Sequence, residues 1–354
     1  MHKLLQKLTI SDAPPGRENE VRDIVVQELK SITDELTIDE LGNVIGKRTG
    51  ENEKNFMLIA HQDDDWALIV SHIDEQGFLR FRRLVGHRWN LLGQRVTIHG
   101  RFGKRTGVIG LPAPHLIPVD VQKRGYQPDE DTMFIDCGAS SRADAKALGL
   151  EVGQFITAHK HFEELPNERL IGNCFDNRVG ITVMIETMRR IRTLTPAISV
   201  TAVASVQEEL GARGAQPAAF KVQPDYAIAL DVAPTGDHPK IKSETVPVRL
   251  RDGPVLLIAD KFGISSRQFN TWLEGVAEAH NVPLQHVVLR TPIHFGTDAS
   301  AVQLARKGTT VTAVLVPTRY FHTTNSIVDY SDLERTVTLL VASINSLGEL
   351  TRNP

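Results

Sequence analysis

The sequence predicts an α/β protein: a three-layer, mostly parallel sheet with helices on both faces, interrupted by a small β-rich domain. Two observations support this fold class. After Leu170, helical and strand patterns alternate along the chain, which is typical of a parallel sheet covered on both faces. Between about Ser71 and Leu165, short β segments rich in Arg and Gly replace the long helical patterns. The 354 residues suffice for about two domains.

The first elements are one helix and three strands. Val21, Ile24, Val25 and Leu29 recur at spacings of three and four within residues 18–32, which predicts an amphipathic helix. Short apolar strands are expected at 36–38, 44–46 and 56–60, separated by Asp, Gly and Asn turns.

Residues 72–165 are interpreted as an insertion. Strands are expected at 78–81, 95–99, 107–110, 133–137 and 155–158, with one short helix at 142–148. Glycines spaced like turns predict a small barrel or sandwich. Residues 1–71 and 166–354 together form the predicted α/β domain.

The last half of the chain contributes alternating elements to that domain. Helices are expected at 176–191, 212–220, 266–280, 299–307 and 332–347. Strands are expected between them, at 197–206, 226–230, 284–289 and 310–316.

Composition excludes several classes of function. Forty Lys and Arg against forty-three Asp and Glu give a formal charge of -3, which provides no global attraction for nucleic acid or an anionic membrane. The apolar runs are far shorter than the ~20 residues of a membrane span, and the N-terminus does not resemble a secretory signal. The two cysteines, Cys137 and Cys174, fit a reducing compartment. We therefore expect a cytoplasmic protein.

Acidic and His residues gather at the expected strand ends. They are His61, Asp63, Glu208, Glu209, Asp231 and His322, with Asp176 at the start of a buried helix. Ligands bind at this edge of open α/β sheets. Singly, each residue has an ordinary structural explanation, such as a helix cap for Asp176. Together, carboxylates beside strongly apolar strands predict a compensating cation.

Two His and three carboxylates suit a pair of divalent cations such as zinc. We expect Asp176 to bridge them, His61 and Asp231 to bind one, and His322 and Glu209 to bind the other. Asp63 either orients the His61 ring or forms a turn in an acidic run. Because Glu208 and Glu209 are consecutive, they point in opposite directions on extended backbone. One of them can bind a metal while the other faces the cleft, and we assign Glu209 as the ligand and Glu208 as the candidate general base.

Eight ordered motifs make the sequence resemble the glutamyl aminopeptidase or tetrahedral aminopeptidase family of dinuclear metallopeptidases, some of which carry an endoglucanase label. The motifs begin at Ala60, Gly93, Ile135, Cys174, Gln207, Asp231, Gly296 and Arg319 and run nearly end to end. The resemblance implies the ligand and base roles given above. It also implies a zinc-exopeptidase-like catalytic domain at 1–71 and 166–354, a PDZ-like dimerisation domain at 72–165, and homodimers assembled into dodecamers.

The chain departs from the family pattern near the site. Asp64, Asp65 and Trp66 follow His61-Gln62-Asp63 in place of Glu-Ile-Gly, Asn177 replaces a second Asp, and Phe295 replaces a Gly. These changes leave the predicted ligands and base intact but bear on the substrate pocket.

The expected activity is a metal-dependent aminopeptidase with zinc, cobalt or manganese, in which Glu208 takes a proton as hydroxide attacks the peptide. Two alternatives remain open at this stage: a glycoside hydrolase, since paired carboxylates also cleave glycosides, and a non-catalytic assembly protein with the same fold. We interpret Arg178 and Arg319 as structural partners of carboxylates.

Overall fold

The structure, a computed structural model, describes residues 1–87, 90–123, 130–239, 241–242, 244–290 and 295–350. The chain divides into two compact units. The first comprises Met1–Asp64, His161–Phe321 and Asn325–Pro354, and the second comprises Asp65–Lys160 with His322–Thr324. Among the described residues, none of the helices has the length and hydropathy that crossing a membrane requires.

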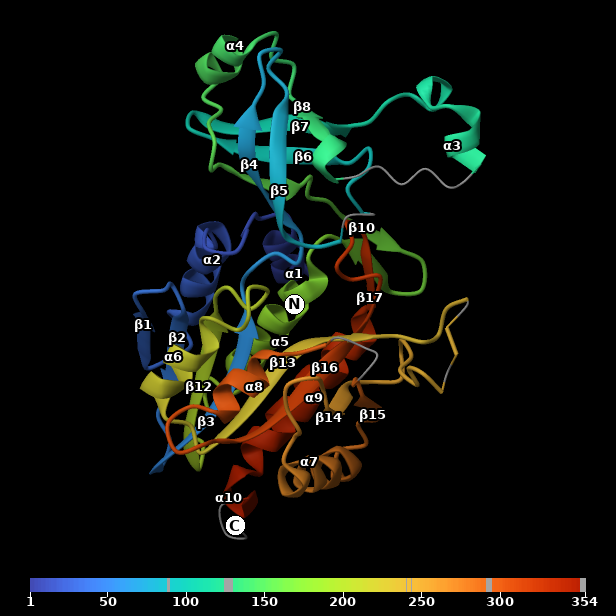
Figure 1. Cartoon of the computed structure of the whole chain (residues 1–354). Coiled ribbons are helices and arrows are strands. Elements are labelled where there is room, and N and C mark those ends of the chain that lie inside the picture. The colour runs from blue at the N-terminus through green and yellow to red at the C-terminus, as the bar shows by residue number, and fades with distance from the viewer. Residues whose placement is uncertain (88–89, 124–129, 240, 243, 291–294, 351–354) are drawn as a thin grey trace. The chain divides into compact units, whose positions relative to one another are not determined.

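The first unit is built on one eleven-stranded sheet (Figure 1). Its main path runs β1-β2-β12-β3-β13-β16-β17-β11-β10, and β14 joins β15 to β16. The strands are β1 (Glu35–Ile38), β2 (Val44–Arg48), β3 (Asn52–His61), β10 (Phe162–Leu165), β11 (Arg169–Gly172), β12 (Ile198–Ser205), β13 (Tyr226–Pro234), β14 (Val255–Ala259), β15 (Gln285–Val288), β16 (Thr310–Arg319) and β17 (Ser326–Asp329).

The prediction of a mostly parallel sheet is correct only for its centre. The four central strands β12, β3, β13 and β16 are parallel to one another. Outside them, β1, β2, β10, β11, β14 and β17 pair antiparallel. The physical reason is connection length: short loops join β1 to β2 and β10 to β11, and parallel neighbours would need long crossovers. The sheet is therefore mixed.

Eight of the described α-helices cover the sheet of the first unit: α1 (His2–Thr9), α2 (Asn19–Leu29), α5 (Phe175–Arg190), α6 (Ala215–Val222), α7 (Arg267–Ala279), α8 (Asp298–Gln303), α9 (Tyr330–Asn345) and α10 (Leu347–Leu350). Helix α4 (Arg142–Ala147) lies in the second unit.

 The second unit also contains α3 (Val119–Lys123), so the described residues hold ten α-helices in all.

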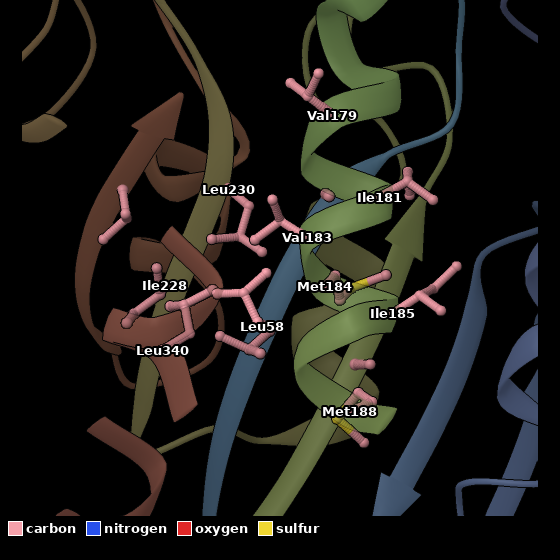
Figure 2. Packing of buried hydrophobic residues seen from close by; sticks show 14 of the residues in the cluster. Leu58, Val179, Ile181, Val183, Met184, Ile185, Met188, Ile228, Leu230 and Leu340 are labelled. Atoms are coloured by element: carbon pink, nitrogen blue, oxygen red, sulfur yellow. The ribbon is translucent and has the colours of Figure 1, made fainter. Parts of the chain in front are cut away.

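The core of the first unit forms two clusters, and alternate residues of β3 point into different ones. Phe56, Leu58 and Ala60 pack with α1, α2, α5 and α9, whereas Met57 and Ile59 pack with α6 and α8. This is the period-two alternation of a strand buried on both faces. Figure 2 shows part of the first cluster, in which Val183 of α5 points toward Leu230.

Most central elements lie where the sequence predicts them, but several short ones were missed. In the first unit the missed elements are α1, α10, β10, β11, β14 and β17, and in the second unit the strand Ala67–Ile73 and the helix Val119–Lys123 were missed. Helix α1 has only eight residues, yet Leu4, Leu5 and Leu8 are buried on one side of it. A pattern this short gives too few repeats for a period to be recognised.

The second unit contains a closed barrel of six antiparallel strands in the order β4-β5-β8-β7-β6-β9. They are β4 (Ala67–Ile73), β5 (Leu79–Val85), β6 (Arg95–Gly100), β7 (Gly103–Gly110), β8 (Phe134–Asp136) and β9 (Phe155–Ala158). Trp66, Leu68, Phe81, Ile98 and Ile135 are among the residues that fill its own core. Of the two architectures expected for the insertion, the barrel is the one observed.

Candidate active site

The predicted ligands His61 and Asp231 lie at the carboxyl end of the central sheet, just beyond a break in strand pairing. Strands β3 and β13 pair only as far as Ile59 and Ala229. His61 is the last residue of β3, and Asp231 lies within β13 rather than after it. Both residues therefore lie two positions past the last β3–β13 pair, where the facing backbone groups of these two strands can bond to other partners.

The start of α5 occupies one of those backbone groups. Asn177 Nδ2 donates a 2.7 Å hydrogen bond to the carbonyl oxygen of Leu230, and Asn177 Oδ1 accepts one of 2.9 Å from the Gly180 N–H. An ionised Asp at position 177 could not donate the first bond. The departure from the family pattern at Asn177 thus has a structural role, and it fixes the turn that carries Asp176.

Asp176 does not sit in regular helix. It lies within α5, but its backbone angles of φ -79° and ψ 104° are non-helical. Its Oδ1 lies 3.1 Å from His61 Nε2, while Asp231 Oδ1 lies 3.9 Å from the same nitrogen. One ligand atom from each of the three residues lies within 4.8 Å of the others. The structure therefore brings together three of the five predicted metal ligands in one buried cluster.

The electrostatics of this cluster indicate an excess of negative charge. Burial raises the pKa of Asp231 well above its ordinary value, and the neighbouring charge of Asp176 raises it further. Burial alone would lower the pKa of His61, but contacts with Asp176 and Asp63 raise it well above the ordinary value. A divalent cation would compensate these carboxylates and displace the imidazole proton. The donor set of one His and two carboxylates fits such a cation.

Asp63 joins the His61 strand to the loop that carries Glu208 and Glu209. Its side chain is fully buried. Asp63 Oδ1 lies 3.2 Å from His61 Nδ1 and accepts a 3.1 Å hydrogen bond from the Glu208 N–H, while Oδ2 accepts one of 3.1 Å from the Glu209 N–H. One carboxylate therefore contacts the ring of a candidate ligand and fixes the backbone of the candidate base.

Most N–H groups of the loop of residues 206–214 donate hydrogen bonds. Asn43 Oδ1 accepts from Val206 at 3.0 Å, and Glu18 Oε1 accepts from Gln207 at 3.2 Å. Within the loop, the carbonyl of Glu208 accepts from the N–H groups at positions 211 and 212. Glu208 itself is half-buried, and desolvation raises the pKa of its carboxyl well above the ordinary value. A raised pKa suits a group that must accept and release a proton near neutrality.

Arg178 and Arg319 pair with carboxylates, as the sequence analysis expected. Arg178 is fully buried and forms an ion pair with Asp64. It also donates to the carbonyl oxygens of Gln62 at 2.5 Å and Asp63 at 3.3 Å. Arg319 binds Asp237, at 2.7 Å from Nη2. The Arg178 guanidinium thus holds the backbone that directly follows His61.

His322 belongs to the second unit, as part of the short segment His322–Thr324. Its N–H donates to Asp65 Oδ2 at 2.7 Å, and its carbonyl oxygen accepts from Asn90 Nδ2 at 2.7 Å. Its backbone is left-handed, with φ 57°. The roles of His322 and Glu209 as ligands stay predictions.

Sequence reasoning missed three polar residues around the site. Asn43 and Glu18 bind the 206–214 loop, and Asp298 is 3% exposed and accepts a 2.5 Å hydrogen bond from Ser205 Oγ. Burial raises the pKa of Asp298 to about 6. Asp298 stood in one of the recognised motifs, but Asn43 and Glu18 come from a turn and a helix start, where polar residues are ordinary.

Buried His and carboxylate side chains, gathered at the carboxyl edge of a sheet beside a restrained Glu, are typical of metal-dependent hydrolases. Comparison with known proteins identifies the family. Residues 42–339 match the model of the peptidase M42 family, described as M42 glutamyl aminopeptidase. The chain belongs to this family and is therefore a peptide hydrolase, in agreement with the peptidase activity expected from the sequence.

Individual relatives match over nearly the whole chain. A putative aminopeptidase, FrvX, of Escherichia coli K12 is 36% identical over 349 residues, which cover 98% of this chain and 95% of FrvX. The crystal structure of a TET aminopeptidase from a marine sediment archaeon, Thaumarchaeota archaeon SCGC AB-539-E09, has a TM-score of 0.93 and 32% identity, covering 98% and 96% of the two chains. The TET1 peptidase of Pyrococcus horikoshii, described as assembling into a tetrahedron or a large octahedral shell, has a TM-score of 0.86 and 29% identity, covering 97% and 98%.

Proposed function

We propose that this protein is an aminopeptidase that removes single N-terminal residues from peptides with the help of two divalent cations. The observation that carries the proposal is the buried cluster of His61, Asp176 and Asp231, whose ligand atoms lie within 4.8 Å of one another. Membership of the M42 family supports the same reading. Its substrates are accordingly peptides with a free α-amino group.

In this proposal His61 and Asp231 would hold one cation, Glu209 and His322 would hold the other, and Asp176 would be shared by both. A carboxylate of Asp length on a fixed turn suits the bridging position, because its oxygen atoms have little freedom to move. Imidazole and carboxylate ligands fit zinc, with cobalt or manganese as the other cations that this donor set accepts. When bound, such cations lower the pKa of water from ~15.7 towards ~7 and polarise the scissile carbonyl.

Glu208 is the proposed general base. Its carboxylate takes a proton from the attacking water and passes that proton to the leaving amine as the peptide bond breaks. Asp63 supports this chemistry in two ways: it lies 3.2 Å from His61 Nδ1, where it can orient the ring, and it holds the Glu208 N–H. The proton path therefore uses groups that the fold already keeps in place.

Glu208→Gln tests the assignment. The amide keeps the shape of the side chain but cannot take a proton, so kcat on aminoacyl chromogenic substrates should fall by about 10²–10⁴-fold, with metal content unchanged. Glu278→Gln, an exposed position on α7, is the matched control and should retain full activity. A Glu208→Gln enzyme with wild-type kcat would refute the assignment. A wild-type protein that turns over nothing on a broad panel, with zinc, cobalt or manganese supplied, would instead favour a non-catalytic assembly protein.

We further propose that residues 72–165 act as a PDZ-like dimerisation domain, and that homodimers build a dodecamer in the cytoplasm. Support comes from the shell-forming P. horikoshii relative and, for the compartment, from the two free cysteines. In the same proposal, residues 1–71 and 166–354 form a three-layer, zinc-exopeptidase-like catalytic domain. Mass photometry of the intact protein would show a twelve-chain species, and a monomer at micromolar concentration would contradict this assembly.

A further inference from the structure

Glu18 is a buried carboxylate that the mechanism above does not use. It precedes α2 and is 5% exposed. Its Oε1 accepts two backbone hydrogen bonds, one of 2.7 Å from the Gly16 N–H and one of 3.2 Å from the Gln207 N–H. The two donors lie far apart in the sequence, so this single oxygen ties the N-terminal segment to the loop that carries Glu208.

The bond to Gln207 completes a row of four restrained N–H groups. Residues 206, 207, 208 and 209 donate in turn to Asn43, to Glu18 and to the two oxygens of Asp63. Gln207 has a left-handed backbone, with φ 54°, which a side chain bearing a Cβ adopts only where its surroundings compensate the strain. Glu18 provides the acceptor at that strained residue, directly before the candidate base.

We propose that Glu18 is a positioning residue for catalysis, which holds Gln207 and thereby sets the direction of the Glu208 carboxylate. This inference rests on the proposed function, because it assumes that Glu208 acts as the base. It goes beyond that function by assigning a role to a residue in the N-terminal segment, distant in sequence from every proposed ligand.

The protonation of Glu18 does not remove this role. Burial, with a contribution from the charge of Asp63, raises the pKa of Glu18 to about 7. A protonated carboxyl still accepts hydrogen bonds through its carbonyl oxygen, so the neutral acid can hold the same donors. A Gln at this position also keeps an acceptor oxygen of the same reach and is therefore the conservative substitution.

Three substitutions and one control test the proposal in the metal-loaded protein. Glu18→Leu removes the acceptor, Glu18→Asp keeps the charge but shortens the side chain by one methylene, and Glu18→Gln keeps both reach and acceptor. The control is Glu20→Ala. Glu20 is a nearby carboxylate in the same segment, and it accepts the Asp12 N–H at 3.1 Å.

We expect Glu18→Leu and Glu18→Asp to lower kcat by about 10–100-fold, the effect of misplacing a catalytic group by about 1 Å. KM and metal content should stay within twofold of wild type. Amide hydrogen exchange of residues 206–210 should become at least tenfold faster in both variants. Glu18→Gln should restore exchange and kcat to within threefold of wild type, and Glu20→Ala should leave both unchanged.

Two results would overturn the proposal: unchanged exchange at residues 206–210 in Glu18→Leu and Glu18→Asp, or equal losses of kcat in Glu18→Asp and Glu20→Ala. The exchange measurement also separates this proposal from the proposed function. If the wild-type protein hydrolyses no peptide, the aminopeptidase assignment fails, while the exchange rates still decide whether Glu18 holds the loop. If Glu18→Leu does not fold, Glu18→Asp and Glu18→Gln carry the comparison.

Discussion

Replacing Arg178 with Met should be among the most destabilising single substitutions in the first unit. The guanidinium is fully buried. It pairs with Asp64 and donates to the carbonyl oxygens of Leu8, Ser11, Gln62 and Asp63. Met has a similar length but donates no hydrogen bond, so the substitution leaves Asp64 charged and several carbonyl groups without this donor.

The magnitude follows from these contacts. Removing one partner of a buried ion pair costs about 3–5 kcal/mol, and each buried hydrogen bond left unmade costs about 1 kcal/mol or more. The carbonyl groups can relax towards water or towards other donors, so we expect the free energy of unfolding to fall by at least about 4 kcal/mol. Combining Arg178→Met with Asp64→Asn removes the stranded charge and should recover about 1–3 kcal/mol.

Guanidinium chloride unfolding, followed by circular dichroism and tryptophan fluorescence, measures both changes. Arg190→Met is the matched control, since Arg190 lies on the same helix and makes half-exposed ion pairs with Glu186 and Glu334. Such pairs contribute less than about 1 kcal/mol. The reasoning would be refuted if Arg178→Met cost no more than Arg190→Met, or if the double variant were less stable than Arg178→Met alone.

Three further substitutions or treatments give separate tests. Burial raises the pKa of Asp332 to about 6, above the ~3.9 of an unfolded Asp, so ionising this carboxyl group opposes folding. Relative to Asp332→Asn, the free energy of unfolding of the wild type should fall by about 3 kcal/mol between about pH 4 and pH 6 and stay level above pH 6. Thermal unfolding of both proteins across this range checks the sign, and an opposite slope would contradict it. Asp63→Asn should lower metal affinity or kcat by about 10–100-fold, because one amide oxygen cannot replace both carboxylate oxygens. Isothermal titration with zinc measures the affinity, and wild-type affinity together with wild-type kcat would contradict the prediction. Removing metal with a chelator should abolish activity and lower the melting temperature, and zinc should restore both; activity that survives complete chelation would count against a metal centre.

The central part of the fold could be predicted because its signals are local. Strands β3 and β13 contain uninterrupted apolar runs, at 56–60 and 226–230, and buried parallel strands have this character in any context. The positions of His61 and Asp231 at the sheet edge followed from those runs. The antiparallel margins could not be predicted in the same way, since β10, β11 and β17 have four residues each and owe their pairing to neighbours contributed by distant segments.

The residues proposed as metal ligands could be singled out from the sequence, whereas most of the residues that hold them in place could not. A His or Asp directly after an apolar strand is visible in the sequence, whereas the partner of a side chain depends on the tertiary fold. In the sequence Asp64 is one residue of an acidic run, and its ion pair with Arg178 is visible only in the structure. In the same way, nothing in the segment around Glu18 indicates that it accepts the N–H of Gln207, 189 positions away.

Closure of the six-stranded barrel constrains how another chain could associate with it. Each of its strands already has a neighbour on both sides, and peptide recognition by strand addition requires an exposed sheet edge. Among the described residues, closure therefore leaves little exposed edge along which a second polypeptide could extend this barrel through its main chain. Side chains and loops are then the main groups through which this unit can contact another chain, so charge-reversing surface substitutions are a better means of controlling such contacts than backbone-mimicking peptides.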